Sequence, residues 1–399
     1  MTIHRPTLSR LALSGLLLAL PLNAAFAQDV TAVADRLKAM LANQGVDLNW
    51  SGITGDASSM VMEGVTVKPA VEKDALPIGN VTLEGVSEAA GGYTVATVST
   101  PAFSRTEDGV SVAISPFVMH ELTIPTETAG NADPLAGFLM YKSAELANMT
   151  VKVGDKTAFT MDNFSVEITP PADGKAMEFT GEAEKFTGDL TLVEDPKSKD
   201  VIEALGYQNV SGSIEVAGSW QPSDGKMALS QYDITVDDAG TFGMTFDVSG
   251  YTVDFIKSLQ EMQKKMAEKP EGADASAEGM AMLGLLQQLT FNGASVRFDD
   301  DSLTGKVLDY VAKQQGMSAK DIANQAKAIM PFGMAQLNNP ELTAQVTAAV
   351  SAFLDDPKSL EIAAEPGSPV PFAQLMATGM ANPLDLPKTL GLTVTANED

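Results

Sequence analysis

Apolar and polar residues alternate along most of residues 46–250, and short turns that contain Asp-Gly or Gly-Asp separate the alternating runs. Strict alternation is typical of a strand with one apolar face, and such short turns are typical of antiparallel hairpins. We therefore expect a meander of roughly ten or more strands in this part of the chain. The clearest alternating runs are residues 110–114, 164–168, 232–236 and 242–248.

Residues 29–45 have apolar side chains at a spacing of three to four, which predicts an amphipathic helix. Asp29 is its expected N-cap, and Gly45 is its expected C-terminal stop. A shorter helix is expected among the strands, at residues 196–205. The apolar face of the first helix comprises Val30, Val33, Leu37, Met40 and Leu41.

After Tyr251 the apolar spacing is mostly that of helices, with one further strand predicted at residues 291–298 and a possible closing strand at residues 390–395. We therefore predict an α+β fold, in which helices pack on one face of a long antiparallel β-meander sheet. An N-terminal helix precedes the sheet, and the C-terminal third is mostly helical. The expected regions are a leader at 1–27, a β-rich region with the N-terminal helix at 28–250, and a mostly helical region with one or two added strands at 251–399.

Four segments share one pattern: an apolar residue, a polar residue, Gly or Asn, an apolar residue, and then Ser or Thr. They begin at Met62, Leu83, Met161 and Phe291. Gly and Asn tolerate the backbone of a bulge or tight bend, so we expect such a bend at the third position, near a strand start. Irregular intervals separate the segments, which excludes a regular solenoid.

The first 27 residues have the three parts of a secretory signal peptide. Arg5 and Arg10 lie in a basic segment, an apolar run follows, and Ala25-Phe26-Ala27 forms a small-x-small cleavage site. The apolar run is shorter than the roughly 20 residues that a membrane span needs. We therefore expect cleavage after Ala27, no transmembrane anchor in the mature chain, and a periplasmic or secreted protein.

The composition narrows the possible partners and chemistry. The chain has 26 Lys and Arg against 52 Asp and Glu, a formal net charge of −26. This acidity argues against nucleic acid as a partner, since binding to phosphates requires clustered cations. The sequence has no cysteine, which excludes disulfides, thiol nucleophiles and thiolate metal sites. Phosphate-binding glycine motifs are absent too, so no cofactor is expected.

Two arrangements could support a hydrolase. His120 is the only histidine that remains after the predicted cleavage, and strict alternation places His120, Leu122 and Ile124 on one face of a strand. His120 could act as a general base, but no Gly-x-Ser-x-Gly motif accompanies it. Alternatively, a pair of carboxylates could serve as acid and base, as in glycosidases. The sequence does not single out one such pair.

Asp299, Asp300 and Asp301 form the densest run of carboxylates in the sequence. Calcium prefers oxygen ligands, so these three residues are the candidate metal site. They lack the spacing and the terminal Glu of a calcium-binding loop. We favour a turn from a strand to a helix, with Asp301 or Ser302 as the N-cap.

The chain contains 20 methionines, several of them in the predicted C-terminal helices. Methionine side chains adapt to irregular apolar surfaces. They could simply fill the core, or they could line a groove for a lipid or a partner helix. The candidate residues for binding a hydrophobic ligand are Met280, Met282, Leu283, Leu286, Met330 and Met334.

Two resemblances extend this interpretation. The runs VRFDDDSLTG at 296–305, NNPEL at 338–342 and PVPF at 369–372 look like the signature of an uncharacterised secreted Gram-negative family, a domain of unknown function. More loosely, the strand region resembles AsmA-like periplasmic proteins, whose long curved sheets are linked with lipid traffic and envelope maintenance. The cleavable leader differs from the membrane anchor of those proteins. Neither resemblance transfers a functional residue.

The sequence thus leads to three hypotheses of function. The first is a non-enzymatic periplasmic envelope protein that binds a lipid, another hydrophobic ligand or a protein partner. The second is a periplasmic hydrolase that uses His120 or a carboxylate pair, and the third is a calcium-stabilised scaffold. We favour the first, because a one-faced sheet and Met- and Leu-rich helices offer apolar surface while catalytic signatures are missing.

Overall fold

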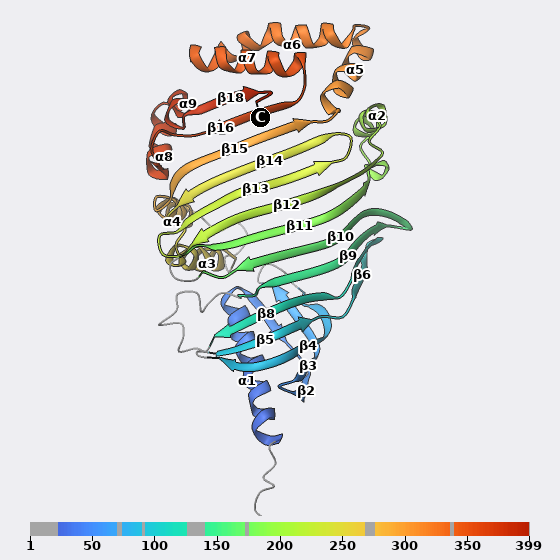
Figure 1. The fold of residues 1–399 in the computed structure, drawn as a ribbon, viewed down its shortest axis with the longest axis vertical. Coiled ribbons are helices and arrows are strands. Elements are labelled where there is room, and N and C mark those ends of the chain that lie inside the picture. Colours follow the sequence, from blue (N-terminus) through green and yellow to red (C-terminus); the bar gives the residue numbers. More distant parts are fainter. Residues whose placement is uncertain are drawn as a thin grey trace, which may run out of the picture.

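The structure is a computed structural model that describes residues 23–69, 74–89, 92–125, 140–171, 175–267, 276–335 and 339–398. Most of the predicted leader falls on residues 1–22 and lies outside the described residues. Within the described residues, eighteen strands join into one antiparallel sheet. Figure 1 shows these strands stacked along the longest axis of the molecule, in rainbow order from blue to red.

The N-terminal half of the chain is one helix followed by strands. The elements are α1 Asn23–Asn43, β1 Val46–Asn49, β2 Gly52–Asp56, β3 Ser59–Pro69, β4 Leu76–Ala89, β5 Gly92–Ser99, β6 Phe103–Glu107, β7 Val110–Ile114, β8 Phe117–Pro125, β9 Ser143–Val153, β10 Lys156–Thr169 and β11 Met177–Asp189.

The C-terminal half alternates strands with helices. The elements are η3 Leu190–Leu192, α2 Pro196–Leu205, β12 Asn209–Gln221, β13 Lys226–Val236, β14 Gly240–Ser249, α3 Val253–Ala267, α4 Ser276–Leu286, β15 Thr290–Asp300, α5 Leu303–Gln315, α6 Ala319–Met334, α7 Pro340–Asp355, β16 Ser359–Ala364, β17 Val370–Pro371, α8 Phe372–Ala381, η5 Pro383–Asp385, α9 Leu386–Thr389 and β18 Leu392–Ala396.

The central part of the sheet is a simple meander, in which each strand from β8 to β16 pairs with the next. At one end β18 pairs with β16, and the short β17 pairs with β15. At the other end β3 pairs with both β1 and β2, and β4, β5 and β8 follow in order. The hairpin of β6 and β7 joins the sheet through β9. The predicted antiparallel meander is therefore confirmed.

The shared sequence motif marks points where a positive φ interrupts the alternation of faces. Gly64, Gly85 and Asn163 have φ angles of 58°, 65° and 51°. An inserted left-handed residue lets apolar residues three positions apart share a face. Met62 and Val65, which flank Gly64, are only 1% and 2% exposed. The expected bends are confirmed, although they lie inside strands; in the fourth segment, β15 shows a register shift against β14.

The most deeply buried core lies between α1 and the strands β1–β5 and β8. Val30, Val33 and Met40 of the predicted helix face are at most 4% exposed, and they pack against strand residues such as Leu83. The expected apolar face of this helix is therefore confirmed. The helix begins at Asn23, so the predicted N-cap, Asp29, lies inside it.

Two parts of the predicted fold are wrong. The C-terminal third is not mostly helical, because it supplies β15–β18, which extend the same sheet. The helices are also not packed together on one face. In Figure 1, α2 and α5 lie at one margin, α3, α4, α8 and α9 lie at the other, and α6 and α7 lie beyond β18. Most of these helices connect one strand to the next, which places them at strand ends.

Candidate functional site: the apolar face of the sheet

One row of side chains crosses ten strands, and every member is apolar. Each residue lies directly opposite the next in the antiparallel register. The row from β8 to β18 is Phe117, Leu146, Phe164, Ala183, Ile214, Ile234, Phe242, Phe298, Leu360 and Ala396. Because neighbouring strands lie about 4.8 Å apart, this row is roughly 43 Å long. We call the sheet surface that carries it the apolar face.

The opposite surface of the same strands is polar and acidic. Glu182, Glu215 and Asp233 lie directly opposite one another on β11, β12 and β13. Further along, Arg297 of β15 opposes Glu361 of β16, and their side chains approach to 3.7 Å. The sheet is therefore amphipathic along these strands, with the apolar row on one surface and these charged side chains on the other.

Among the residues that the structure describes, helices cover the apolar face only at its two ends. α1 covers the N-terminal strands, and α7 packs on β18 and β16. Among the described residues, no α-helix makes extensive contacts with the strands β9–β14. Phe242, Val296 and Ile362, on the adjacent strands β14, β15 and β16, are 42%, 40% and 47% exposed. Large apolar side chains that are exposed together on neighbouring strands mark a binding surface.

At the centre of this face, aromatic rings of β11 lie over glycines of β12 and fill the space that those glycines leave. A Cβ atom added to Gly218 would lie 2.4 Å from the ring of Phe179, and one added to Gly212 would lie 2.8 Å from the ring of Phe186. Both pairs are cross-strand neighbours of β11 and β12. The bare glycine backbone is therefore shielded by carbon, which keeps the apolar face continuous.

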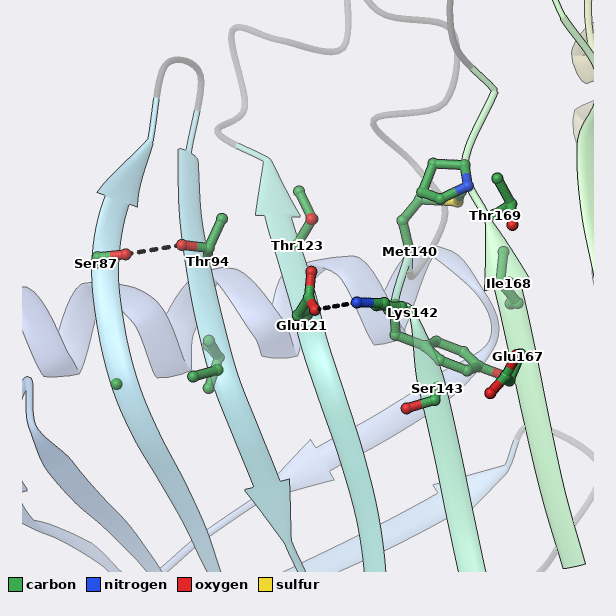
Figure 2. Close-up of a pocket in the computed structure, with 15 residues that line it drawn as sticks. Ser87, Thr94, Glu121, Thr123, Met140, Lys142, Ser143, Glu167, Ile168 and Thr169 are labelled. Atoms are coloured by element: carbon green, nitrogen blue, oxygen red, sulfur yellow. Dashed lines mark hydrogen bonds and ion pairs between the residues drawn. The ribbon is translucent and has the colours of Figure 1, made fainter.

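The polar side of the sheet carries a pocket of about 680 Å³ that is lined by β4, β5, β8, β9 and β10. In Figure 2 the side chains of Glu121 and Lys142 meet across this pocket, at 2.8 Å. The hydroxyls of Ser87 and Thr94 form a separate hydrogen bond of 2.8 Å. Hydroxyls and charges of both signs could hold a small polar ligand here.

The pKa values of Lys142 and Tyr141, which both line this pocket, are raised. The hydrogen bond and the charge of Glu121 raise the pKa of the Lys142 ammonium, and burial raises the pKa of the Tyr141 hydroxyl. Both shifts strengthen the ordinary protonated state at neutral pH, so neither group is prepared to act as a base. Glu121 has a φ of 52°, which is unusual for a residue with a side chain.

His120 does not share a face with Leu122 and Ile124, so that prediction is wrong. The left-handed Glu121 interrupts the alternation between them. Met119 pairs with the buried Val98 on the apolar side, which leaves His120 on the polar side opposite Thr97. Its Nδ1 lies 3.4 Å from the Thr97 hydroxyl. Within the described residues, no carboxylate hydrogen-bonds to His120 in the way that a catalytic histidine requires.

The three consecutive aspartates have separate partners. The guanidinium Nε of Arg297 donates to Asp299 at 2.9 Å, and the backbone N–H of Thr304 donates to Asp300 at 2.7 Å. Ser302 is the N-cap residue of α5, as one of the two predictions had it, but its side chain makes no capping hydrogen bond, and the carboxylate of Asp300 accepts one instead. Among the residues that the structure describes, no three Asp, Glu or His side chains are grouped to hold one metal ion.

The six candidate residues for a hydrophobic ligand are divided between two distant places. Met280, Met282, Leu283 and Leu286 belong to α4, which packs beside α3, whereas Met330 and Met334 belong to α6, which packs on α5 and α7. Figure 1 shows α4 at one margin of the sheet, near the ends of β13 and β14, and α6 beyond β18. These residues do not form one groove.

Sequence reasoning missed the apolar row as a site. The alternation of each strand was visible, but the register that aligns ten strands depends on the positions of turns and left-handed residues along the whole meander. The pocket residues Glu121 and Lys142 were also missed. They come from different strands, and no local motif connects them.

The C-terminal part of the chain matches a known protein family. Residues 233–397, less than half of the chain, match a family described as "Uncharacterized protein". The match runs from β13 to β18 and supports the resemblance of the C-terminal part to an uncharacterised family. No curated protein matches the chain. Within the described residues, no helix combines the length and the apolar character that crossing a membrane requires.

Proposed function

We propose that this protein is a non-enzymatic envelope protein that binds the hydrocarbon chains of a lipid on the apolar face. The observation that carries this proposal is the ten-strand apolar row, which helices cover only at its ends. A sheet surface of this kind costs free energy when it faces water, so a long row kept open favours an apolar ligand.

The dimensions of the row suit extended chains. Two acyl chains end to end span the hydrocarbon core of a bilayer, which is about 30 Å thick. The part of the row that the described helices leave uncovered runs from β9 to β14, five strand spacings or roughly 24 Å, and could therefore accommodate about one extended chain. The rings of Phe164, Phe242 and Phe298 supply much of the apolar area of the row. Because no polar side chain interrupts the row, it offers little selectivity for one chain length.

The expected affinity is moderate. Each methylene removed from water contributes about 0.8 kcal/mol, so a chain that buries half of sixteen carbons gains roughly 6 kcal/mol. That corresponds to a dissociation constant on the order of 10⁻⁵ M. Such binding suits a carrier or a conduit, from which the ligand must also leave.

The proposal includes the location. Cleavage after Ala27 would deliver the chain to the periplasm, where lipids must cross water between membranes. The absence of cysteine and the acidic composition fit that compartment. The loose resemblance of the strand region to AsmA-like proteins, which are linked with lipid traffic, supports the same proposal.

Native mass spectrometry of the mature chain, purified from its own envelope without detergent, tests the proposal. We expect bound molecules whose masses match lipids in a solvent extract of the same sample. We also expect a mature N-terminus at Gln28. A bare protein that also fails to bind added fatty acid in vesicle-free solution would contradict the lipid-binding function.

A further inference from the structure

The helices at one margin of the sheet bury unusually little of their apolar surface. We define the helical margin as α3, α4, α8, η5 and α9, that is, residues 253–267, 276–286 and 372–389. Neither α4 nor α8 has a buried residue. Met280 of α4 is 74% exposed, Leu283 is 49% exposed, and Met380 of α8 is 88% exposed. The side chains of Met266 and Leu384 are 48% and 42% exposed.

The parts of this margin are joined through the sheet. α4 packs beside α3. The backbone N–H of Phe372, at the start of α8, donates to the carbonyl of Leu289 at 3.0 Å, shortly after α4 ends. Thr290 of β15 pairs with Pro371, the residue before α8. Figure 1 shows α3, α4, α8 and α9 along the same side of the sheet. The exposed side chains therefore belong to one continuous side of the molecule.

The character of α4 indicates what this side contacts. A short helix that is apolar on all sides is normally either buried in a core or placed at a membrane interface. Burial does not apply, since α4 has no buried residue. Its length of 11 residues gives about 16 Å, which is too short to cross a bilayer. For an apolar segment of about 10–14 residues, the alternative that satisfies both observations is a segment at the membrane interface, although α4 lacks the charged face of an amphipathic surface helix.

The balanced charge of the described helices permits contact with a lipid surface, but it does not attract them to anionic headgroups. The helical margin contains four lysines and four carboxylates, while the whole chain has a net charge of −26. α8 has no charged residue, and α4 has only Glu278. The acidic polar face would be repelled by anionic headgroups, whereas this neutral margin would not. Lys257 and Lys265 of α3 are exposed and can meet phosphate groups.

We propose that the helical margin docks on the surface of a lipid bilayer, with the side chains of Met280, Leu283 and Met380 inserted among the headgroups. This inference names a membrane as the partner of the protein. The docking itself does not require the lipid-binding function, but its biological purpose rests on that function. The strand ends beside α4 and α8 would then face the membrane, so that hydrocarbon chains could move between the bilayer and the apolar face.

Flotation of the mature full-length chain with vesicles of phosphatidylethanolamine and phosphatidylglycerol, at a ratio of 3:1, tests this proposal. The test variant combines Met280→Gln, Leu283→Gln and Met380→Gln. The matched control combines Ile329→Gln and Phe332→Gln on α6, where the two side chains are 58% and 78% exposed. We expect the test variant to bind vesicles at least about tenfold more weakly than the wild type, and the control to bind within about twofold.

Three outcomes would overturn the docking proposal: no vesicle binding by the wild type, an equal loss in the α6 control, or a wild-type dimer that the test variant converts to monomer without loss of vesicle binding. Fatty-acid binding in vesicle-free solution separates this proposal from the lipid-binding function. The test variant should retain that binding, because its substitutions lie off the apolar face. A Phe242→Gln variant should bind fatty acid about fivefold more weakly but still float with vesicles.

Discussion

Phe242 of β14 lies directly opposite Phe298 of β15. Among the described residues, a helix packs on Phe298 but not on Phe242. The ring of Phe298 meets that of Phe353 in α7 edge-on, with 6.5 Å between centroids. Phe242, one strand further from α7, is 42% exposed. The same row is thus closed on one side of this pair and open on the other.

Replacing Phe242 with Gln tests whether the open side binds ligand. Because the ring is already substantially exposed, the free energy of unfolding should change by less than about 1 kcal/mol. Affinity for a fluorescent fatty acid should fall about fivefold, since a large apolar contact is lost. Phe332→Gln is the control, as Phe332 is exposed on α6 and lies outside the row. Equal affinities in both variants and the wild type would count against a ligand on this face.

Glu121 allows a test of the left-handed residue inside β8. Valine normally favours strands, but a β-branched residue fits poorly at the φ of 52° found here. Glu121→Val should therefore be about 1–2 kcal/mol less stable than Glu121→Asn, because Asn tolerates this conformation. Both variants lose the ion pair with Lys142, so chemical denaturation of the two isolates the backbone effect. Equal stability would mean that β8 can restore regular alternation at no cost.

Features of the fold that depend on neighbouring residues can be predicted from the sequence, whereas features that depend on residues far apart in the chain cannot. The helix at Pro196–Leu205 was predicted correctly, because Asp195, Pro196 and Gly206 mark its ends locally. The left-handed positions at Gly64, Gly85 and Asn163 were predicted from a shared motif, but Glu121 was not, since glutamate carries no such signal. The closing strand expected at residues 390–395 is present as β18, whereas β16 and β17 were missed because both are short and lie close to prolines. The candidate site could not be predicted, because it forms only when the pairing register aligns apolar residues from ten strands.

Gly218 and Gly305 provide opposite tests of backbone crowding. A Cβ at Gly218 would meet the carbonyl oxygen of Ala228 at 2.6 Å as well as the ring of Phe179, so Gly218→Ala should cost about 1–3 kcal/mol. At Gly305, in the first turn of α5, a Cβ would meet nothing within 4 Å. Gly305→Ala should therefore stabilise the protein by about 0.5–1 kcal/mol. Thermal unfolding of both variants measures the contrast, and a stabilised Gly218→Ala would show that the ring does not lie over the glycine.

The capping box of α6 predicts a dependence on pH. The Ser318 hydroxyl and backbone N–H donate to the carboxylate of Asp321 and lower the pKa of that group. A carboxyl with a lower pKa in the folded state contributes stability above its ordinary pKa, and this contribution is lost as pH falls through the folded value. The stability difference between the wild type and Ser318→Ala should therefore shrink below about pH 4.

The difference should not vanish in acid, because the Ser318 oxygen still accepts the backbone N–H of Asp321 at 3.2 Å. Urea unfolding at several pH values gives the stability difference, and carboxyl NMR of Asp321 gives its midpoint in both proteins. We expect the midpoint to rise in Ser318→Ala. A midpoint that does not move would refute the proposed origin of the pKa shift.

The lipid-binding function is tested most directly by photo-crosslinking from the two faces of one strand. A photoreactive phenylalanine is placed at Phe242, on the apolar face, or at Thr241, which hydrogen-bonds to Thr235 on the polar face. After irradiation of living cells, mass spectrometry of the purified protein identifies the adducts. We predict lipid adducts from position 242 and none from position 241. Equal labelling from both positions, or protein adducts alone from position 242, would contradict a lipid bound on the apolar face.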